Sequence, residues 1–446
     1  LDGFLTPGND DFSLEIMFRI FEENDELVTY LYVPQQFVFA EKSAKTTIST
    51  DSIFIEFSHL GIKYFAEIDK QNNILKGIWQ HHKTKFDLEM FFRDDEHAIQ
   101  FNRPQNPKKT SDYFILEQNI QLSDNQNRIS GNLYLPDTIN KYPLAIITKG
   151  GAAPERDYMF SGHRTFEVIA DYLVKSGIAV FIFDVRGSGK STGNFSENTT
   201  NIYANDVLEV HDYFKSNSYI NAEKIGFIGY SEGALIAFIA ASKNINHTAF
   251  IVALSAPAVN ILEFFKQQYK DLFNDNTLSE DKRKILFEYS DKQYNMIKKD
   301  MSKAAFRKEL NALAEEYATY FSENEIRKYK INNVGAHQFL TKVYSPWLKY
   351  FLTIEPESII RRLNCSVMAL YGSKDVLVNP IINSIAIENA LNKSEIDTYE
   401  VEVMEGLNNI FQPAYNGRME EYMIIEETID LSVLQKIYLF IYMNTK

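Results

Sequence analysis

Cysteine is almost absent from this chain of 446 residues, because Cys365 is its single representative. One cysteine excludes an internal disulfide framework and any metal cluster built on cysteine ligands. No apolar run reaches the roughly 18 residues that a membrane-spanning helix requires, so no membrane span is predicted. Basic residues are the minority, with 46 Lys and Arg against 60 Asp and Glu and a net charge of −14. That balance argues against nucleic acid or an anionic membrane surface as a partner.

Hydrophobic residues make up 45% of the chain and aromatic residues 14%. This composition suffices for a buried core and differs from that of a disordered chain. The length predicts two or three domains. No signal peptide is visible, and the residues leave the compartment open between exported or periplasmic and cytoplasmic. They also leave the oligomeric state open.

Short segments of alternating hydrophobicity fill the N-terminal part of the chain. Six strands are predicted, at residues 14–20, 27–33, 52–57, 62–68, 74–79 and 86–92. Alternation with a period of two at this spacing is typical of a small antiparallel barrel or sandwich. We therefore expect an N-terminal β domain over residues 1–98. Residues 99–111 contain prolines and few large apolar side chains, which predicts a linker.

Strand-like and helix-like segments alternate from residue 112 onward, which predicts a parallel sheet covered by helices on both faces. The expected strands are 144–148, 179–183, 225–228, 366–370 and 398–404, and the expected helices are 166–175, 204–214, 233–241 and 431–442. Residues from about 259 to 345 have helical periodicity and no convincing strand. We interpret this stretch as a helical cap inserted into an α/β domain that spans 112–446.

The segment Gly229-Tyr230-Ser231-Glu232-Gly233 has the pattern G-x-S-x-G where a predicted strand gives way to a helix. This nucleophile-elbow pattern holds the serine on a sharp turn that leaves no room for larger flanking side chains. The helix N-terminus beneath it favours negative charge developing on a substrate oxygen. Ser231 is therefore the predicted nucleophile. The alternative is an ordinary strand-to-helix turn, which the flanking elements and a downstream acid disfavour.

A serine hydroxyl needs a base to remove its proton, and after this elbow the partners follow in the order Ser, acid, His. Asp375 lies in a Gly-containing loop after the strand predicted to end at Leu370, and it is the predicted acid. The turn Lys149-Gly150-Gly151-Ala152 follows the first strand of the α/β region. Its small residues allow backbone N–H groups to approach a substrate oxygen. We expect an oxyanion hole formed by the N–H groups of Glu232 and a residue near Gly151.

Together these segments resemble the bacterial α/β-hydrolase fold esterases, serine hydrolases that carry a small N-terminal β domain. The likeness covers nearly the whole chain, and the stretches that carry it are 74–80, 149–151, 155–157, 162–163, 169–173, 183–193, 229–233, the Asp375 loop and 406–412. The resemblance implies an α/β-hydrolase fold and hydrolysis of a small-molecule ester or acyl substrate through an acyl-enzyme. It implies no metal and no cofactor.

The last of these stretches departs from the family pattern at one position. Members of the family have Gly-Leu-Asn-His there, and the His is the general base, whereas this chain has Asn409. An asparagine amide reproduces part of the hydrogen bonding of imidazole but accepts no proton near neutral pH. None of the eight histidines follows Asp375. Three hypotheses stay open: an engineered replacement that traps a substrate, a natural pseudo-hydrolase that binds without turnover, or a base supplied by His163 or His337.

Ester hydrolysis is the predicted reaction. A peptidase or thioesterase with the same catalytic residues is the alternative, because the elbow motif does not determine which leaving group is cleaved from the acyl carbon.

Gly187-Ser188-Gly189-Lys190-Ser191 resembles the end of a P-loop. Asp184 stands where that pattern requires glycine, so we expect no nucleotide site and a structural Arg186. His81 and His82 are adjacent in a strand and would point to opposite faces, so we expect no metal there.

Overall fold

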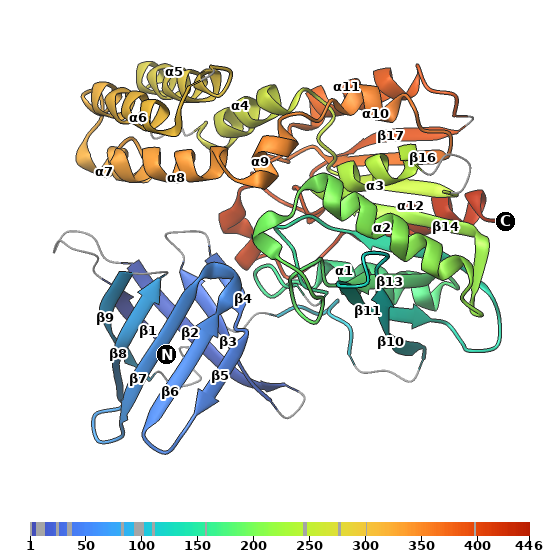
Figure 1. Ribbon diagram of the computed structural model, residues 1–446, viewed down its shortest axis with the longest axis horizontal. Helices are drawn as coiled ribbons and strands as arrows, with labels where there is room; N and C mark the ends of the chain where they lie inside the picture. The colour runs from blue at the N-terminus through green and yellow to red at the C-terminus, as the bar shows by residue number, and fades with distance from the viewer. Residues whose placement is uncertain are drawn as a thin grey trace. The chain divides into compact units, whose positions relative to one another are not determined.

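The computed structural model describes residues 2–5, 14–23, 26–33, 38–81, 84–92, 102–108, 112–156, 158–243, 248–274, 278–299, 301–396 and 398–446. The chain forms two compact units (Figure 1). Unit 1 consists of Leu1–Lys109, Glu155–Asp171 and Met419–Ile429, and unit 2 consists of Thr110–Pro154, Tyr172–Arg418 and Asp430–Lys446. Each unit is therefore assembled from segments that are far apart in the sequence.

Unit 1 contains an antiparallel sheet whose described strands have the order β4-β3-β2-β1-β9-β8-β7-β6-β5. The strands are β1 (Asp2–Leu5), β2 (Leu14–Glu23), β3 (Glu26–Val33), β4 (Val38–Lys42), β5 (Lys45–Ile48), β6 (Ser52–Phe57), β7 (Ile62–Asp69), β8 (Ile74–His81) and β9 (Thr84–Phe91). The hydroxyls of Thr29 in β3 and Thr46 in β5 lie 2.8 Å apart, so the two ends of the sheet approach each other. The predicted antiparallel β region at the N-terminus is confirmed.

The alternating pattern of the sequence accounts for the core of this sheet. Burial alternates residue by residue along β6 and β7, as the pleat of a strand with one buried face requires. Phe18 is fully buried at the centre, with its ring centroid 5.5 Å from that of Tyr64 and 6.3 Å from that of Trp79. These rings pack together on the buried face of the sheet.

Part of the predicted linker and two motif residues lie outside the described part of the chain: 99–101, 109–111, His82 and Asp157. The described residues 102–108 are held within unit 1. The guanidinium group of Arg103 donates to the carbonyl oxygens of Ser161 and Met423, both at 2.8 Å. This part of the predicted linker is therefore fixed by side-chain hydrogen bonds.

Unit 2 is built on a mixed sheet in the order β10-β11-β13-β12-β14-β15-β16-β17. Its strands are β10 (Phe114–Gln121), β11 (Arg128–Leu135), β12 (Tyr142–Thr148), β13 (Ala179–Phe183), β14 (Ile220–Tyr230), β15 (Phe250–Leu254), β16 (Ser366–Gly372) and β17 (Tyr399–Met404). The strands from β13 to β17 pair in parallel, and β10 and β11 pair antiparallel at one edge. The helices α1 (Thr165–Lys175), α2 (Thr200–Lys215), α3 (Glu232–Lys243), α11 (Pro380–Leu391) and α12 (Leu431–Asn444) connect or follow these strands.

A run of helices lies between β15 and β16, which are neighbours in the sheet (Figure 1). It consists of α4 (Ile261–Leu272), α5 (Glu280–Met296), α6 (Lys303–Ala318), α7 (Glu323–Lys328), α8 (Asn333–Val343), α9 (Pro346–Phe351) and α10 (Pro356–Ile360). No strand occurs in this stretch among the residues that the structure describes. We call α4 to α10 the helical insertion. The predicted α/β architecture with a helical insertion is confirmed.

Helix α3 runs through the core of unit 2. Its residues from Gly233 to Ser242 are all buried, and a helix that is apolar on every side is typical of such a position. The helix thus fixes the backbone at its N-terminus firmly against the sheet. None of the described helices, α3 included, has both the length and the apolar character needed to cross a membrane.

Candidate active site

The turn between β14 and α3 holds Ser231 in the left-handed backbone region, with φ at +52°. This conformation is uncommon for a residue other than glycine and is often found at functional sites. The N–H of Ser231 donates to the carbonyl oxygen of Leu254 at 2.8 Å, and its own carbonyl accepts from Ala234 at 3.0 Å. Hydrogen bonds on both sides therefore hold the strained residue in place.

Gly229 and Gly233 stand where the elbow has no space for a side chain. A Cβ at Gly233 would lie 2.0 Å from the carbonyl oxygen of Thr148, and a Cβ at Gly229 would lie 2.5 Å from the Cα of Ala234. Thr148 ends β12, and its hydroxyl donates to the carbonyl oxygen of Gly233 at 2.8 Å. The end of β12 and the elbow meet backbone to backbone, which explains the glycines of the motif.

Asp375 is buried in the loop that follows β16. Its Oδ1 accepts from the N–H groups of Leu377 and Val378, both at 2.8 Å, and its Oδ2 accepts from Nδ2 of Asn409 at 2.7 Å. Burial raises the pKa of Asp375 to about 6, although these hydrogen bonds act in the opposite direction. The backbone thus orients the carboxyl group toward Asn409.

The loop that carries Asn409 is closed by the side chains of Asn408 and Gln412. Oδ1 of Asn408 accepts from the N–H of Gln412 at 2.9 Å, and its Nδ2 donates to Oε1 of Gln412 at 2.9 Å. Both side chains are buried. A Cβ at Gly372 would lie 2.3 Å from the carbonyl oxygen of Asn408, so the end of β16 contacts this loop directly. Groups other than the side chain of Asn409 therefore set the position of that residue.

Asn409 is buried and uses both ends of its side-chain amide. Nδ2 donates to Asp375, and Oδ1 accepts from the hydroxyl of Tyr230. The N–H toward Asp375 corresponds to the imidazole N–H that meets the acid in a Ser-His-Asp triad. The opposite end, where a histidine would accept the serine proton, is a carbonyl oxygen here. Neither of these two hydrogen bonds involves Ser231.

The two predicted oxyanion residues, Gly151 and Glu232, lie in contact. A Cβ at Gly150 would lie 2.0 Å from Oε2 of Glu232, and the backbone of Gly151 hydrogen-bonds to the Glu232 carboxyl group. Oε1 of Glu232 accepts from the Thr200 hydroxyl at 2.8 Å and from the Trp347 indole N–H at 2.7 Å. Burial raises the pKa of Glu232, and these hydrogen bonds lower it by less. Sequence reasoning assigned a role to the N–H of Glu232 and missed its side chain.

The two histidines considered as substitute bases have other surroundings. His163 is buried in unit 1, where Nδ1 lies 2.9 Å from the Thr428 hydroxyl and Nε2 lies 3.0 Å from the carbonyl oxygen of Tyr422. Burial lowers the pKa of His163 to about 4. His337 is exposed on α8. Both ring nitrogens of His163 thus have structural hydrogen bonds.

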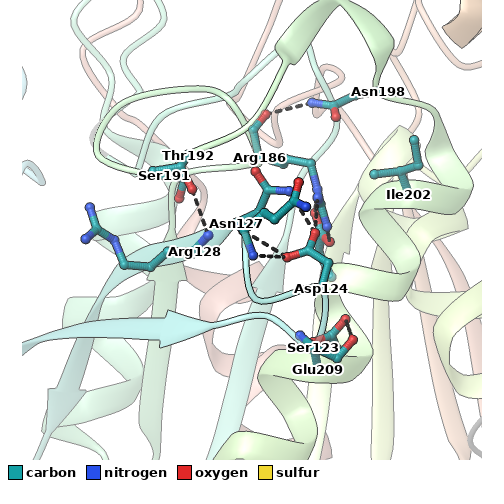
Figure 2. Close-up of polar contacts among 12 residues, drawn as sticks. Ser123, Asp124, Asn127, Arg128, Arg186, Ser191, Thr192, Asn198, Ile202 and Glu209 are labelled. Carbon is teal, nitrogen blue, oxygen red and sulfur yellow. Dashed lines mark hydrogen bonds and ion pairs between the residues drawn. The ribbon is translucent and has the colours of Figure 1, made fainter.

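Arg186, which directly precedes the segment that resembles a P-loop, is held by ion pairs and hydrogen bonds to residues outside that segment. The guanidinium group donates to Asp206 through Nε at 3.0 Å and also through Nη2, and it donates to Asp124 through Nη1 at 3.1 Å. Figure 2 shows Arg186 between Asp124 and Asn198, whose amide donates to the Arg186 carbonyl oxygen at 2.7 Å. These contacts tie the loop after β13 to α2. They account for Arg186 as a structural residue, as the sequence predicts.

Metal-ligating side chains do not cluster in the described ranges. No three His, Cys, Asp or Glu residues there are placed to hold an ion. Cys365 is buried, and burial raises the pKa of its thiol to about 12. A thiol with such a pKa is protonated and unreactive at neutral pH.

Residues 161–304 match the family model described as serine aminopeptidase, S33. No curated protein matches the chain. Among solved structures, an esterase of Pyrococcus furiosus is 16% identical, with a TM-score of 0.46 over 78% of this chain and 100% of its own. Est1E of Butyrivibrio proteoclasticus, solved with ferulic acid bound, is 16% identical, with a TM-score of 0.42 over 73% and 98%. The α/β hydrolase GrgF of Penicillium sp. sh18 is 14% identical, with a TM-score of 0.45 over 74% and 99%.

Proposed function

We propose that this chain is an α/β hydrolase that cleaves carboxylic esters through an acyl-enzyme formed at Ser231. One observation carries the proposal: Asn409 donates a hydrogen bond of 2.7 Å to Asp375, and these are the two residues proposed to stand at the positions of the base and the acid. The strands before Ser231, Asp375 and Asn409 are β14, β16 and β17, which run parallel within one sheet. Their carboxyl ends lie at the same edge, where α/β enzymes bind their ligands.

In the proposed reaction, Oγ of Ser231 forms a bond to the ester carbonyl carbon. The carbonyl oxygen becomes an oxyanion, stabilised by the N–H of Glu232 and by an N–H near Gly151. The bond from the carbonyl carbon to the alkoxy oxygen then breaks, and the leaving alkoxide takes up a proton from water to become the alcohol. A water molecule next attacks the acyl carbon, the bond to Oγ breaks, the carboxylic acid leaves, and Oγ takes back a proton. Asn409 cannot take the serine proton, so in this proposal the proton passes to water. Losing the base of such a triad costs on the order of a million-fold in turnover.

The same observation supports a second candidate function. Both ends of the Asn409 amide are engaged, by Asp375 and by Tyr230, and the amide itself accepts no proton near neutral pH. The chain would then be a pseudo-hydrolase that binds an acyl substrate without turning it over. Since the matching family model is described as an aminopeptidase, amides and thioesters belong in the substrate panel beside esters.

The test compares hydrolysis of short-chain p-nitrophenyl esters by this chain and by its Asn409→His variant. We expect turnover to rise by several orders of magnitude, because Asn408 and Gln412 fix the loop and leave position 409 to supply the base. Adding Ser231→Ala to Asn409→His is the matched control and should return the rate to background. A parent chain that is already fast would contradict the assignment of Asn409 to the position of the base.

A serine-directed fluorophosphonate probe separates the two candidate functions when it is applied to the parent chain, because labelling at Ser231 indicates a reactive nucleophile and no labelling favours the pseudo-hydrolase. We expect the Asn409→His variant to be labelled at Ser231 and the Ser231→Ala control to remain unlabelled. If neither the parent chain nor its Asn409→His variant hydrolyses any ester, thioester or amide while short acyl ligands still bind, the pseudo-hydrolase function replaces the hydrolase function.

A further inference from the structure

We propose that the side chain of Glu232 is a positioning residue that couples the helical insertion to the oxyanion turn. By oxyanion turn we mean Gly150 and Gly151, which follow β12. The role of this coupling in turnover rests on the proposed function, whereas the coupling itself does not.

The first arm of the coupling joins Glu232 to the oxyanion turn. The carboxyl group of Glu232 packs against Gly150 because glycine has no side chain. A Cβ at this position would lie 2.0 Å from Oε2 and 2.6 Å from Cδ of Glu232. The Gly151 backbone also hydrogen-bonds to the same carboxyl group. The turn and the carboxyl group therefore cannot move independently.

The second arm joins Glu232 to the helical insertion. The indole N–H of Trp347 in α9 donates to Oε1 of Glu232 at 2.7 Å. Trp347 is itself held by ring packing, since its ring stacks on that of Phe351 with centroids 5.1 Å apart. Phe351 is buried and contacts Phe265 of α4, with centroids 5.8 Å apart. A shift of the helical insertion would thus reach Glu232 through Trp347.

A third contact fixes the carboxyl group from the side of α2. The hydroxyl of Thr200, the first residue of that helix, donates to Oε1 of Glu232 at 2.8 Å and is fully buried. The carboxyl group thus receives hydrogen bonds from three separate segments, and each donor is a neutral group. These contacts hold the carboxyl group from the oxyanion turn, from α2 and from α9.

The position of Glu232 gives the coupling its consequence for catalysis. Glu232 directly follows Ser231, so its backbone N–H is one expected oxyanion donor, while its side chain holds the turn that carries the other. Displacements well below 1 Å matter for such donors, because oxyanion stabilisation requires distances of about 2.7 to 3.1 Å. The packing of α9 against Glu232 and the distance between the two oxyanion donors would then change together.

The experiment measures amide hydrogen exchange at Gly151 in the full-length chain by mass spectrometry. We compare Trp347→Phe, which removes the indole N–H and keeps an aromatic ring, with Glu232→Ala and with the control Glu223→Gln, an exposed carboxylate of the same unit. Glu232→Ala should raise the exchange rate at Gly151 by roughly tenfold, the ratio expected for one hydrogen bond to an acidic group. Trp347→Phe should raise the same rate severalfold, although the hydrogen bond it removes is to Glu232 and not to the turn.

Unchanged exchange at Gly151 in Trp347→Phe would overturn the coupling. If Glu232→Ala does not fold, Glu232→Gln takes its place, because it keeps an oxygen for Trp347 and Thr200 while losing the acidic acceptor for Gly151.

In the Asn409→His chain, Trp347→Phe should lower kcat for p-nitrophenyl esters severalfold with KM nearly unchanged. A fall in KM and kcat together would refute the positioning role. If Asn409→His hydrolyses nothing, the proposed function fails, and the exchange rates still decide the coupling.

Discussion

Replacing Asp375 by asparagine should change how the stability of unit 2 depends on pH. The carboxyl group is buried, and its burial raises its pKa from the ordinary 3.8 to about 6. The folded chain therefore binds the Asp375 proton more tightly than the unfolded chain does. The stabilisation by this proton is complete below about pH 4 and is lost as the pH rises through about 6.

The size of the change in unfolding free energy follows from the difference between the pKa of Asp375 in the folded and in the unfolded chain. One pKa unit corresponds to about 1.4 kcal/mol, so a rise of about two units corresponds to about 3 kcal/mol between pH 4 and pH 7. The Asp375→Asn variant has no proton to bind at this position. The free energy of unfolding of the parent minus that of the variant should thus fall by about 3 kcal/mol over this interval.

Urea unfolding at half-unit steps from pH 4 to pH 8 measures this difference. The chain has two tryptophans, Trp79 in unit 1 and Trp347 in unit 2. In a Trp79→Phe background, fluorescence follows unit 2 alone. The exposed Glu395→Gln in the same unit is the control for loss of an acidic group.

Two results would refute this reasoning. A difference between parent and Asp375→Asn that is independent of pH would mean that folding leaves the proton affinity of Asp375 unchanged. A difference that grows with pH would mean that the hydrogen bonds from Leu377, Val378 and Asn409 outweigh the burial of the charge.

Three further substitutions test the contacts around the site and its support. Gly233→Ala should destabilise unit 2 by at least about 3 kcal/mol, since its Cβ would overlap a carbonyl oxygen of β12. Tyr230→Phe should cost about 1 to 2 kcal/mol in urea unfolding, because it removes the donor to the buried Oδ1 of Asn409. Asp206→Ala should destabilise unit 2 by about 1 to 3 kcal/mol, because it removes the buried carboxylate that pairs with Arg186, which keeps only its more exposed partner Asp124.

Each of these substitutions has a matched control in unit 2. Gly177→Ala meets no atom within 4 Å and carries only the strain of φ at +87°, so about 1 kcal/mol is expected. Tyr213→Phe removes an exposed hydroxyl, and Glu280→Gln breaks an exposed ion pair with Lys284. Neither should change the melting temperature measurably. Equal losses in test and control would contradict the contacts named above.

Period and length explain only some of the strands that could or could not be predicted from the sequence, because β10 and β11 were also missed although each has eight residues. The predicted strand at 62–68 is observed as β7, because its side chains alternate between core and solvent. β1, β4 and β5 were missed, since four or five residues hold too few repeats of the pattern. β15 was also missed, and all five of its residues are buried. A short run without polar positions carries no period that separates a strand from a buried helix.

Some residues of the site can be predicted from a local sequence motif, whereas others depend on contacts with residues far away in the sequence. Ser231 and Asp375 could be proposed because their motifs are local and their order along the chain is informative. The side-chain role of Glu232 could not, because Thr200 lies 32 residues before it and Trp347 lies 115 residues after it. The hydroxyl of Tyr230 meets Asn409 across 179 residues, and no spacing along the sequence indicates that contact.

The closure of the 406–412 loop by Asn408 and Gln412 has an evolutionary consequence. The codons for asparagine and histidine differ by one base, and the residues that shape this loop are not the residue that would change. If Asn409 stands at the position of the base, as proposed above, a single base change separates the chain from one that carries the base. The backbone of the loop would be kept in such an exchange, because Asn408 and Gln412 close it, and only the hydrogen bonds of residue 409 to Asp375 and Tyr230 would change.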